Sequence, residues 1–199
     1  PGVKGLERAE KAGIETFVVD YTQIIRSCRE NGISDGDLPD DFDMAEVAQK
    51  QQLTTEDMSD DKVDFFLKTR AIAEKQLLDQ IRKYEIDLLV LAGFMRVLTP
   101  YFIDRVNTEP GEYKIMNIHP ALLPSFPGTD GYGDTFRYGC KIGGCTVHYI
   151  DYGEDTGPII GQRAFEILDT DTLDDIKKKG LEQEWLLYPA CIQKFAESA

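Results

Sequence analysis

The amino-acid sequence predicts an α/β fold whose central sheet is largely parallel and flanked by helices. Apolar segments of strand length alternate along the chain with segments of helical periodicity, which is the order typical of βαβ units. Residues 87–93 (DLLVLAG) form a continuous apolar run, as expected of a parallel strand that is buried on both faces. We interpret residues 1–199 as a single domain, because this length suffices for one sizeable core.

Two short elements are expected at the start of the chain. Residues 5–12 are predicted to form a helix, because Gly13 follows them and glycine commonly ends helices. Residues 16–19 (TFVV) are aromatic and β-branched, which favours a strand.

The composition changes in the next segment. Residues 35–61 contain ten acidic residues and a single basic one, Lys50. We interpret residues 29–62 as an acidic insertion within the domain, with a helix around residues 44–51. A solvated surface excursion is the ordinary interpretation of such a segment, and a contact with a partner or a second copy is the alternative.

The middle of the chain continues the alternation. Residues 65–84 are predicted to form a helix, because their apolar side chains can share one stripe. These side chains are Phe66, Ile72, Leu77, Leu78 and Ile81. Thr99 and Pro100 suit the N-cap and first residue of another helix, and residues 113–119 are expected to form the next strand.

A hairpin and a long helix are expected at the end of the chain. Residues 144–150 alternate as a strand does, and residues 159–168 form a second strand-like segment. Residues 172–198 are predicted to form a helix that Pro189 kinks.

The bulk composition excludes several classes of function. A formal net charge of −14 disfavours nucleic acid as a partner, since binding it requires Lys and Arg to neutralise phosphates. No apolar run reaches the roughly 18 residues of a membrane span. The four cysteines include no CxxC pair, so we expect no metal site and a reducing, cytoplasmic location.

Asn117 and His119 are the strongest candidates for chemistry. They stand two residues apart at the end of an expected strand, so their side chains share a face. An amide donor beside a titratable imidazole suits a reaction in which a carbonyl oxygen becomes negative while a nitrogen loses a proton.

The positions of three further residues suggest their roles. Asp155 lies in a Gly- and Pro-bounded loop; by itself it is a turn residue, but near His119 it would orient the imidazole. Arg96 follows an apolar strand end and suits a carboxylate or phosphate, with a surface salt bridge as the alternative. His148 lies within an alternating strand and is interpreted as structural. From the residues alone, the sequence indicates an α/β enzyme of acyl-transfer type that requires no metal.

Residues 117–128 (NIHPALLPSFPG) resemble the signature of the folate-dependent formyltransferases. The proline at position 120 resembles the glycinamide ribonucleotide formyltransferase family in particular. Four other blocks agree in the family's order: residues 5–13, 91–100, 144–160 and 181–189. The resemblance covers nearly the whole chain outside the acidic insertion.

The resemblance implies a Rossmann-like fold and a reaction. An amine would attack the formyl carbon of 10-formyltetrahydrofolate, the co-substrate, and no metal would take part. Asn117 and His119 would stabilise the oxyanion, and His119, helped by Asp155, would move the proton. The partners implied are small-molecule substrates, with neither nucleic acid nor a membrane, for a monomer or a homodimer.

The resemblance also implies ligand contacts. Arg70 aligns with a family arginine that serves an anionic group, and Glu184 matches the acid expected to hold the glycinamide end. Pro120 is assigned to the ribonucleotide together with Glu184. The residues assigned to folate are Arg70, Met95, Arg96, Val97, Leu98, Asp151, Tyr152, Gly153 and Glu154.

Two departures from the family pattern leave alternatives open. The family begins with a strand and a phosphate-binding loop that these 199 residues do not contain, so we expect the sequence to be N-terminally incomplete. Residues 129–136 replace a His-rich family segment beside the cleft. A different amine acceptor, a non-catalytic folate- or nucleotide-binding protein and a folate deformylase are therefore the alternatives.

Overall fold

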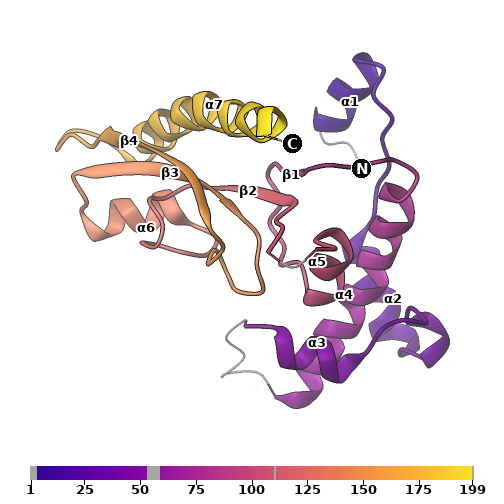
Figure 1. Cartoon of the computed structure of the whole chain (residues 1–199). Helices are drawn as coiled ribbons and strands as arrows, with labels where there is room; N and C mark the ends of the chain where they lie inside the picture. The colour runs from indigo at the N-terminus through magenta and orange to yellow at the C-terminus, as the bar shows by residue number, and fades with distance from the viewer. Residues whose placement is uncertain (1–3, 53–58, 110, 199) are drawn as a thin grey trace.

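A four-stranded sheet organises the fold, in the spatial order β1–β2–β3–β4 (Figure 1). The computed structural model describes residues 4–52, 59–109 and 111–198. The strands are β1 (Leu89–Leu91), β2 (Ile115–His119), β3 (Ile142–Tyr149) and β4 (Ile159–Glu166). The helices are α1 (Lys4–Lys11), α2 (Tyr21–Asn31), η1, a 3-10 turn (Asp35–Asp37), α3 (Met44–Lys50), α4 (Asp60–Ile81), α5 (Pro100–Val106), α6 (Gly131–Tyr138) and α7 (Leu173–Ser198).

The sheet is mixed in the part of the chain that the structure describes. β1 and β2 are parallel, whereas β2 with β3 and β3 with β4 are antiparallel. The α/β class is confirmed, and so is the late hairpin, which is β3–β4. The parallel part is smaller than the sequence indicated, because one expected strand does not pair.

The predicted strand at residues 16–19 is wrong. These residues have no regular structure, and the side chains of Phe17 and Val18 are 40% and 54% exposed. Strand propensity expresses packing against neighbouring strands rather than a backbone preference. No described strand pairs with this segment, so its apolar residues form none.

Several helices agree with the sequence, and two α-helices were missed. α3, α4, α5 and α7 lie where helices were expected, and α7 continues through Pro189. The missed helices are α2, whose N-cap Asp20 accepts a hydrogen bond from the backbone of Gln23 at 3.0 Å, and α6. Among the described residues, no helix has the length and apolar character to cross a membrane.

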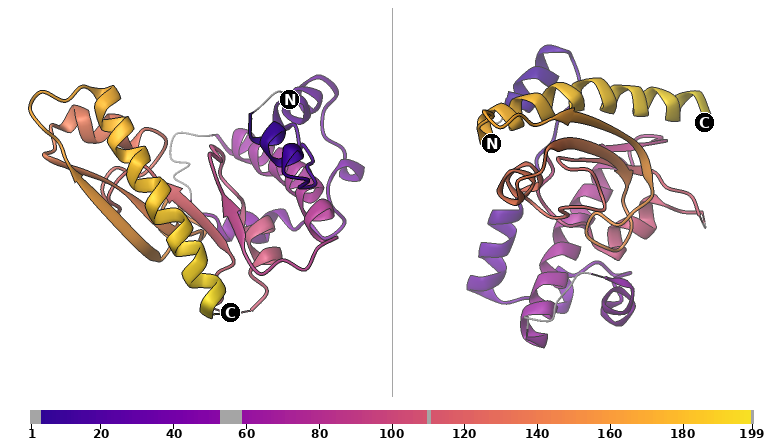
Figure 2. Two further views of the ribbon diagram at one scale, coloured as in Figure 1. Left: turned by 90° about the horizontal axis from the view of Figure 1, so that it is seen from above. Right: turned by 90° about the vertical axis from the view of Figure 1, so that its left-hand side faces the viewer.

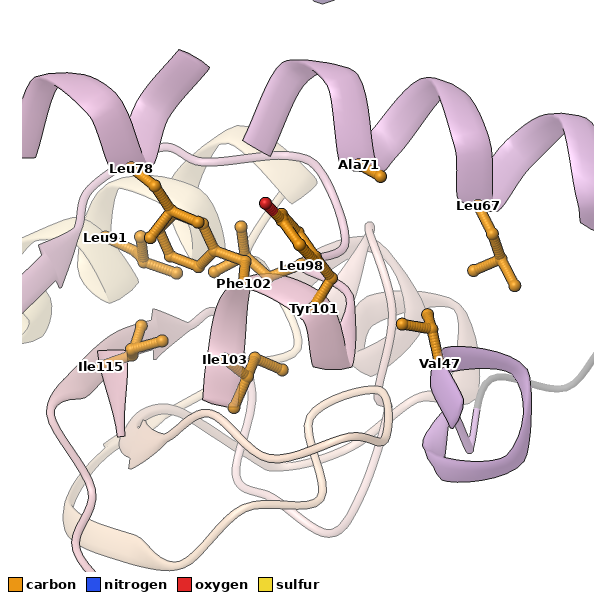
Figure 3. Close-up of a cluster of buried hydrophobic side chains, with 10 residues drawn as sticks. All are labelled: Val47, Leu67, Ala71, Leu78, Leu91, Leu98, Tyr101, Phe102, Ile103 and Ile115. Atoms are coloured by element: carbon orange, nitrogen blue, oxygen red, sulfur yellow. The ribbon is translucent and has the colours of Figure 1, made fainter. Parts of the chain in front are cut away.

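Two apolar clusters hold the sheet from its two faces. The first joins α3, α4 and α5 to β1 and β2 and includes Leu78, Phe102 and Ile115 (Figure 3). The second lies between α7 and strands β2 and β3 and includes Met116 and Leu187. Figure 2 shows α7 stretched along β3 and β4, with α1, α2 and α4 grouped on the other side of the molecule. β2 is therefore covered on both faces, by the first cluster at Ile115 and by the second at Met116.

Glu74 joins α4 to the start of α5. Its side chain is fully buried at 0% exposure. Its Oε1 accepts a hydrogen bond from the backbone N–H of Thr99 at 2.8 Å, and its Oε2 accepts one from the Thr99 hydroxyl at 2.5 Å. Thr99 occupies the expected N-cap position, but its hydroxyl bonds to Glu74 instead of to the helix backbone. Burial raises the pKa of Glu74 to about 8.

As the pH rises from about 5 to about 8, we expect the free energy of unfolding to fall more in the wild-type protein than in a Glu74→Gln variant. The pKa of Glu74 is about 8 in the folded state, against an ordinary value of 4.5. Within this window the unfolded state binds fewer protons, so the contribution of Glu74 is present at low pH and is lost as the pH rises. Urea unfolding at both pH values measures this difference. An equal loss in the two proteins would contradict the assignment to Glu74.

Candidate active site

Asn117 and His119 project from the end of β2 into one cleft. Both line it, as expected of residues two apart in a strand. His119 is only 2% exposed. The carboxyl end of a strand is where open α/β sheets bind ligands, and the apolar cover on β2 positions both side chains there.

His119 and Asp155 form the central contact of the site. Nδ1 of His119 lies 3.2 Å from Oδ2 of Asp155, and Nε2 lies 2.7 Å from the backbone carbonyl of Phe126. Both ring nitrogens thus face acceptors, so the protonated imidazole can donate at each. The pair therefore places an imidazole and a carboxylate in contact at the cleft wall.

The backbone around Asp155 is shaped to point the carboxylate inward. Asp155 has φ of 55°, a left-handed conformation that Asp adopts more readily than most residues. Its Oδ2 also accepts a hydrogen bond from the backbone N–H of Gly128 at 2.8 Å. The turn residue suggested by the sequence is thus also the partner of His119.

His148 supports Asn117 from the neighbouring strand. The two residues are directly opposite each other in the β2–β3 register, and Nε2 of His148 lies 3.5 Å from Nδ2 of Asn117. Burial lowers the pKa of His148 below its ordinary value. With Nδ1 donating to the Tyr149 carbonyl at 2.8 Å, the neutral ring can accept at Nε2 from the Asn117 amide.

The position of His148 beside the site was missed by the sequence analysis. His148 was interpreted as structural from the alternation within its own strand. Pairing of the two expected strands could have indicated this position, because a residue opposite Asn117 on an antiparallel strand lies on the same face of the sheet. Nε2 of His148 also lies 3.6 Å from Oδ1 of Asp155.

Most of the predicted ligand-contact residues line the same cleft. One wall follows β1, the opposite wall is the loop between β3 and β4, and the floor continues past β2. The wall after β1 contains Met95, Arg96, Val97 and Leu98. The opposite wall contains Asp151, Gly153, Glu154 and Asp155, and the floor ends at Pro120.

Three predicted residues do not line the cleft. The Tyr152 hydroxyl donates to Asp104 on α5, so Tyr152 faces away from the cleft. Glu184 accepts a hydrogen bond from the Tyr132 hydroxyl at 2.7 Å. Arg70 contacts the Tyr21 ring, which Arg96 of the cleft wall also contacts.

Arg70, Arg96 and Tyr21 form a cationic group next to the cleft. Both guanidinium groups lie over the Tyr21 ring, with the Cζ of Arg70 5.2 Å and that of Arg96 4.7 Å from the ring centroid. Arg70 is 9% exposed. Within the described residues, its Nε and Nη1 and the Tyr21 hydroxyl have no hydrogen-bond partner, and burial lowers the pKa of Arg70. A carboxylate or phosphate would satisfy these donors.

The described residues contain no group of three or more His, Cys, Asp or Glu side chains arranged to hold a metal ion. The cleft itself offers an amide, an imidazole–carboxylate pair and a guanidinium. This set suits proton transfer and oxyanion stabilisation.

The α/β fold and the polar groups of its cleft restrict the class of protein, and the comparison with known families identifies that class. A family profile described as "Formyl transferase" matches residues 1–192. The chain therefore belongs to the formyl transferase family, which confirms the resemblance found in the sequence.

Individual relatives agree with this assignment. The chain is 44% identical over 127 residues to phosphoribosylglycinamide formyltransferase of Bacillus subtilis (strain 168), covering 63% of this chain and 62% of the relative. It is 42% identical over 113 residues to the protein of the same name from Mycobacterium tuberculosis (strain CDC 1551 / Oshkosh), covering 57% of this chain and 50% of the relative. The matches thus span less than two thirds of these relatives.

A solved structure confirms the fold over the whole chain. The crystal structure of glycinamide ribonucleotide transformylase 1 from Symbiobacterium toebii matches with a TM-score of 0.68 and 29% identity, covering 100% of this chain and 71% of that one. The predicted Rossmann-like formyltransferase fold is therefore confirmed.

Proposed function

We propose that the protein transfers a formyl group from 10-formyltetrahydrofolate to the amine of glycinamide ribonucleotide, a cytoplasmic step of purine biosynthesis. The convergence of Asn117, His119 and Asp155 in one cleft carries this proposal. The names of the relatives support the same acceptor. The partners are then small molecules, and a monomeric or homodimeric state stays a prediction.

The proposed reaction passes through a tetrahedral intermediate. The amine nitrogen forms a bond to the formyl carbon, and the carbonyl oxygen becomes an oxyanion. Asn117 supplies an N–H donor that stabilises this charge, and His119 supplies a second one when its Nε2–H turns from the Phe126 carbonyl to the oxyanion. The bond from the formyl carbon to the folate nitrogen then breaks, and a proton moves from the attacking amine to that nitrogen through His119 and Asp155. The step requires no metal.

The cleft walls suit the folate. Met95, Val97 and Leu98 offer an apolar surface to the flat rings, and the backbone of residues 151–154 offers polar contacts on the other side. Arg96 and Arg70 are assigned to the anionic tail of the folate. Pro120 is assigned to the ribonucleotide. The assignment of Glu184 to the glycinamide end stays a prediction, because Glu184 does not line the cleft.

We expect an Arg70→Met variant to raise the KM for the folate about tenfold or more, with a smaller effect on kcat. A hydrogen bond to a charged group contributes about 1.5–3 kcal/mol. The variant should remain folded, because Arg70 is buried without a hydrogen-bond partner for Nε or Nη1 among the described residues and a hydrophobic residue of similar volume fits such a place. Steady-state kinetics and thermal unfolding measure both effects. Arg26→Met, at an exposed position on α2, is the control, and an unchanged KM in Arg70→Met would refute the assignment.

The absorbance change as 10-formyltetrahydrofolate becomes tetrahydrofolate tests the function itself. Turnover that depends on glycinamide ribonucleotide would support the proposal. Turnover without the ribonucleotide would point to a deformylase. Tight folate binding without turnover would support a non-catalytic binding protein.

A different amine acceptor is the second candidate, and one observation favours it. The segment that departs from the family pattern reaches the cleft, where Thr129 lines the wall. Gly131 at the start of α6 packs against Pro120, so closely that a Cβ atom there would lie 2.7 Å from the Pro120 carbonyl oxygen. A panel of amine acceptors in the same assay separates the two candidates, because the preferred acceptor gives the highest kcat/KM.

A further inference from the structure

The acidic segment (residues 29–62) contacts the loop that forms one wall of the cleft. We call this loop, residues 151–156, the cofactor loop. The backbone N–H of Gln52 donates a hydrogen bond to the carbonyl of Tyr152 at 3.0 Å. The acidic segment is therefore more than a surface excursion, because it reaches the residues beside the site.

A three-residue network strengthens this contact. The Lys50 ammonium lies 2.8 Å from Oδ2 of Asp104, and the Tyr152 hydroxyl donates to Oδ1 of the same carboxylate. Asp104 belongs to α5, which the apolar core holds against α4. Burial and the neighbouring Asp104 raise the pKa of Tyr152 to about 12, so its hydroxyl remains a donor.

The other end of the cofactor loop carries Asp155, which contacts His119 and Gly128. Between the two ends, Oδ1 of Asp151 accepts hydrogen bonds from the Gly153 backbone at 3.1 Å and from the Thr156 hydroxyl at 2.6 Å. These bonds join the first and last residues of the loop. They connect Asp151, next to Tyr152, with Thr156, next to Asp155.

We propose that Lys50 and Tyr152 are positioning residues, which hold the cofactor loop and through it Asp155 by way of Asp104. The acidic segment then holds in position the wall of the cleft that is assigned to the folate. This inference rests on the proposed function, since the wall is assigned to the folate there. Lys50 is the only basic residue among residues 35–61, which gives this one side chain a role that its acidic neighbours cannot take.

The test uses Lys50→Met, Tyr152→Phe and the double variant. Met keeps the length of the lysine side chain, and Phe keeps the ring that packs on the core while it removes the hydroxyl. Lys75→Met is the matched control, because Lys75 forms a similarly exposed ion pair with Asp79 at 2.7 Å on α4. Each protein is measured by hydrogen–deuterium exchange of residues 151–157, by thermal unfolding and by the kcat and KM for 10-formyltetrahydrofolate.

We expect exchange in residues 151–157 to become about fivefold faster in each single variant, the effect of losing one ordinary hydrogen bond. The KM for the folate should rise by about threefold to tenfold, while Tm stays near that of the control, since exposed ion pairs contribute little to global stability. The double variant should show less than the product of the two single effects, because both residues act through Asp104.

Unchanged exchange and unchanged KM in both single variants would overturn the proposal. So would a uniform increase in exchange across the whole chain together with a lower Tm, because that result describes global destabilisation. If the wild-type protein does not turn the folate over, the proposed function fails by itself. The exchange measurements on the single and double variants still decide whether Lys50 and Tyr152 position the cofactor loop.

Discussion

An Asp155→Asn variant is expected to lower kcat by about 10²- to 10³-fold. The Asp155 carboxylate lies 3.2 Å from Nδ1 of His119, and in the proposed mechanism the two side chains move the transferred proton together. Asn has nearly the same shape and tolerates the left-handed backbone at this position. It can also accept the hydrogen bond from Gly128, so the loss would be chemical rather than structural.

The folate absorbance assay with glycinamide ribonucleotide measures this effect. Asp79→Asn is the control, because Asp79 is a carboxylate on the exposed side of α4. The two variants should unfold at similar temperatures. A kcat for Asp155→Asn within a few-fold of the wild type would remove Asp155 from the mechanism and leave His119 to act without a carboxylate.

A Phe102→Ala variant is expected to lower the free energy of unfolding by about 3–5 kcal/mol. Phe102 is 2% exposed and packs in the cluster that joins α5 to α4 and to β1 and β2 (Figure 3). The substitution removes the apolar contacts of the ring and leaves a cavity that the surrounding helices fill only in part. The same core supports Asp104, so the variant also weakens the outer support of the cofactor loop.

Urea unfolding at neutral pH measures the loss of unfolding free energy in Phe102→Ala. Phe136→Ala is the matched control, because Phe136 is 40% exposed on α6 and its truncation should cost much less. A similar loss in the two variants would mean that the cluster between α4 and α5 does not dominate the stability of the fold.

Part of the geometry of the candidate site was predictable, because it depends on local rules. Residues two apart in a strand share a face, which places Asn117 beside His119 whatever the rest of the fold does. The position of Asp155 does not follow from such a rule. The register pairs the end of β3 with the start of β2, and only the tertiary path of the β3–β4 loop brings Asp155 to His119.

The strand at residues 16–19 and helix α6 show where local rules fail. Apolar, β-branched residues form a strand only beside another strand, and residues 16–19 have none in the described chain. Gly131 and Gly133 weaken the helix signal of α6. Tertiary packing decides otherwise, because Gly131 permits close contact with Pro120 and the buried Tyr132 packs against α7.

The sequence by itself determined the fold class, the late hairpin, the long helices and the pair Asn117 and His119, because periodicity and spacing encode them. Only the tertiary structure decided that Tyr21 contacts both Arg70 and Arg96, that His148 lies beside Asn117, and that Tyr152 faces Asp104. Each of these contacts joins residues at least 30 positions apart or turns a side chain within a loop. Such contacts depend on how separate elements pack, and no local pattern in the chain records that packing.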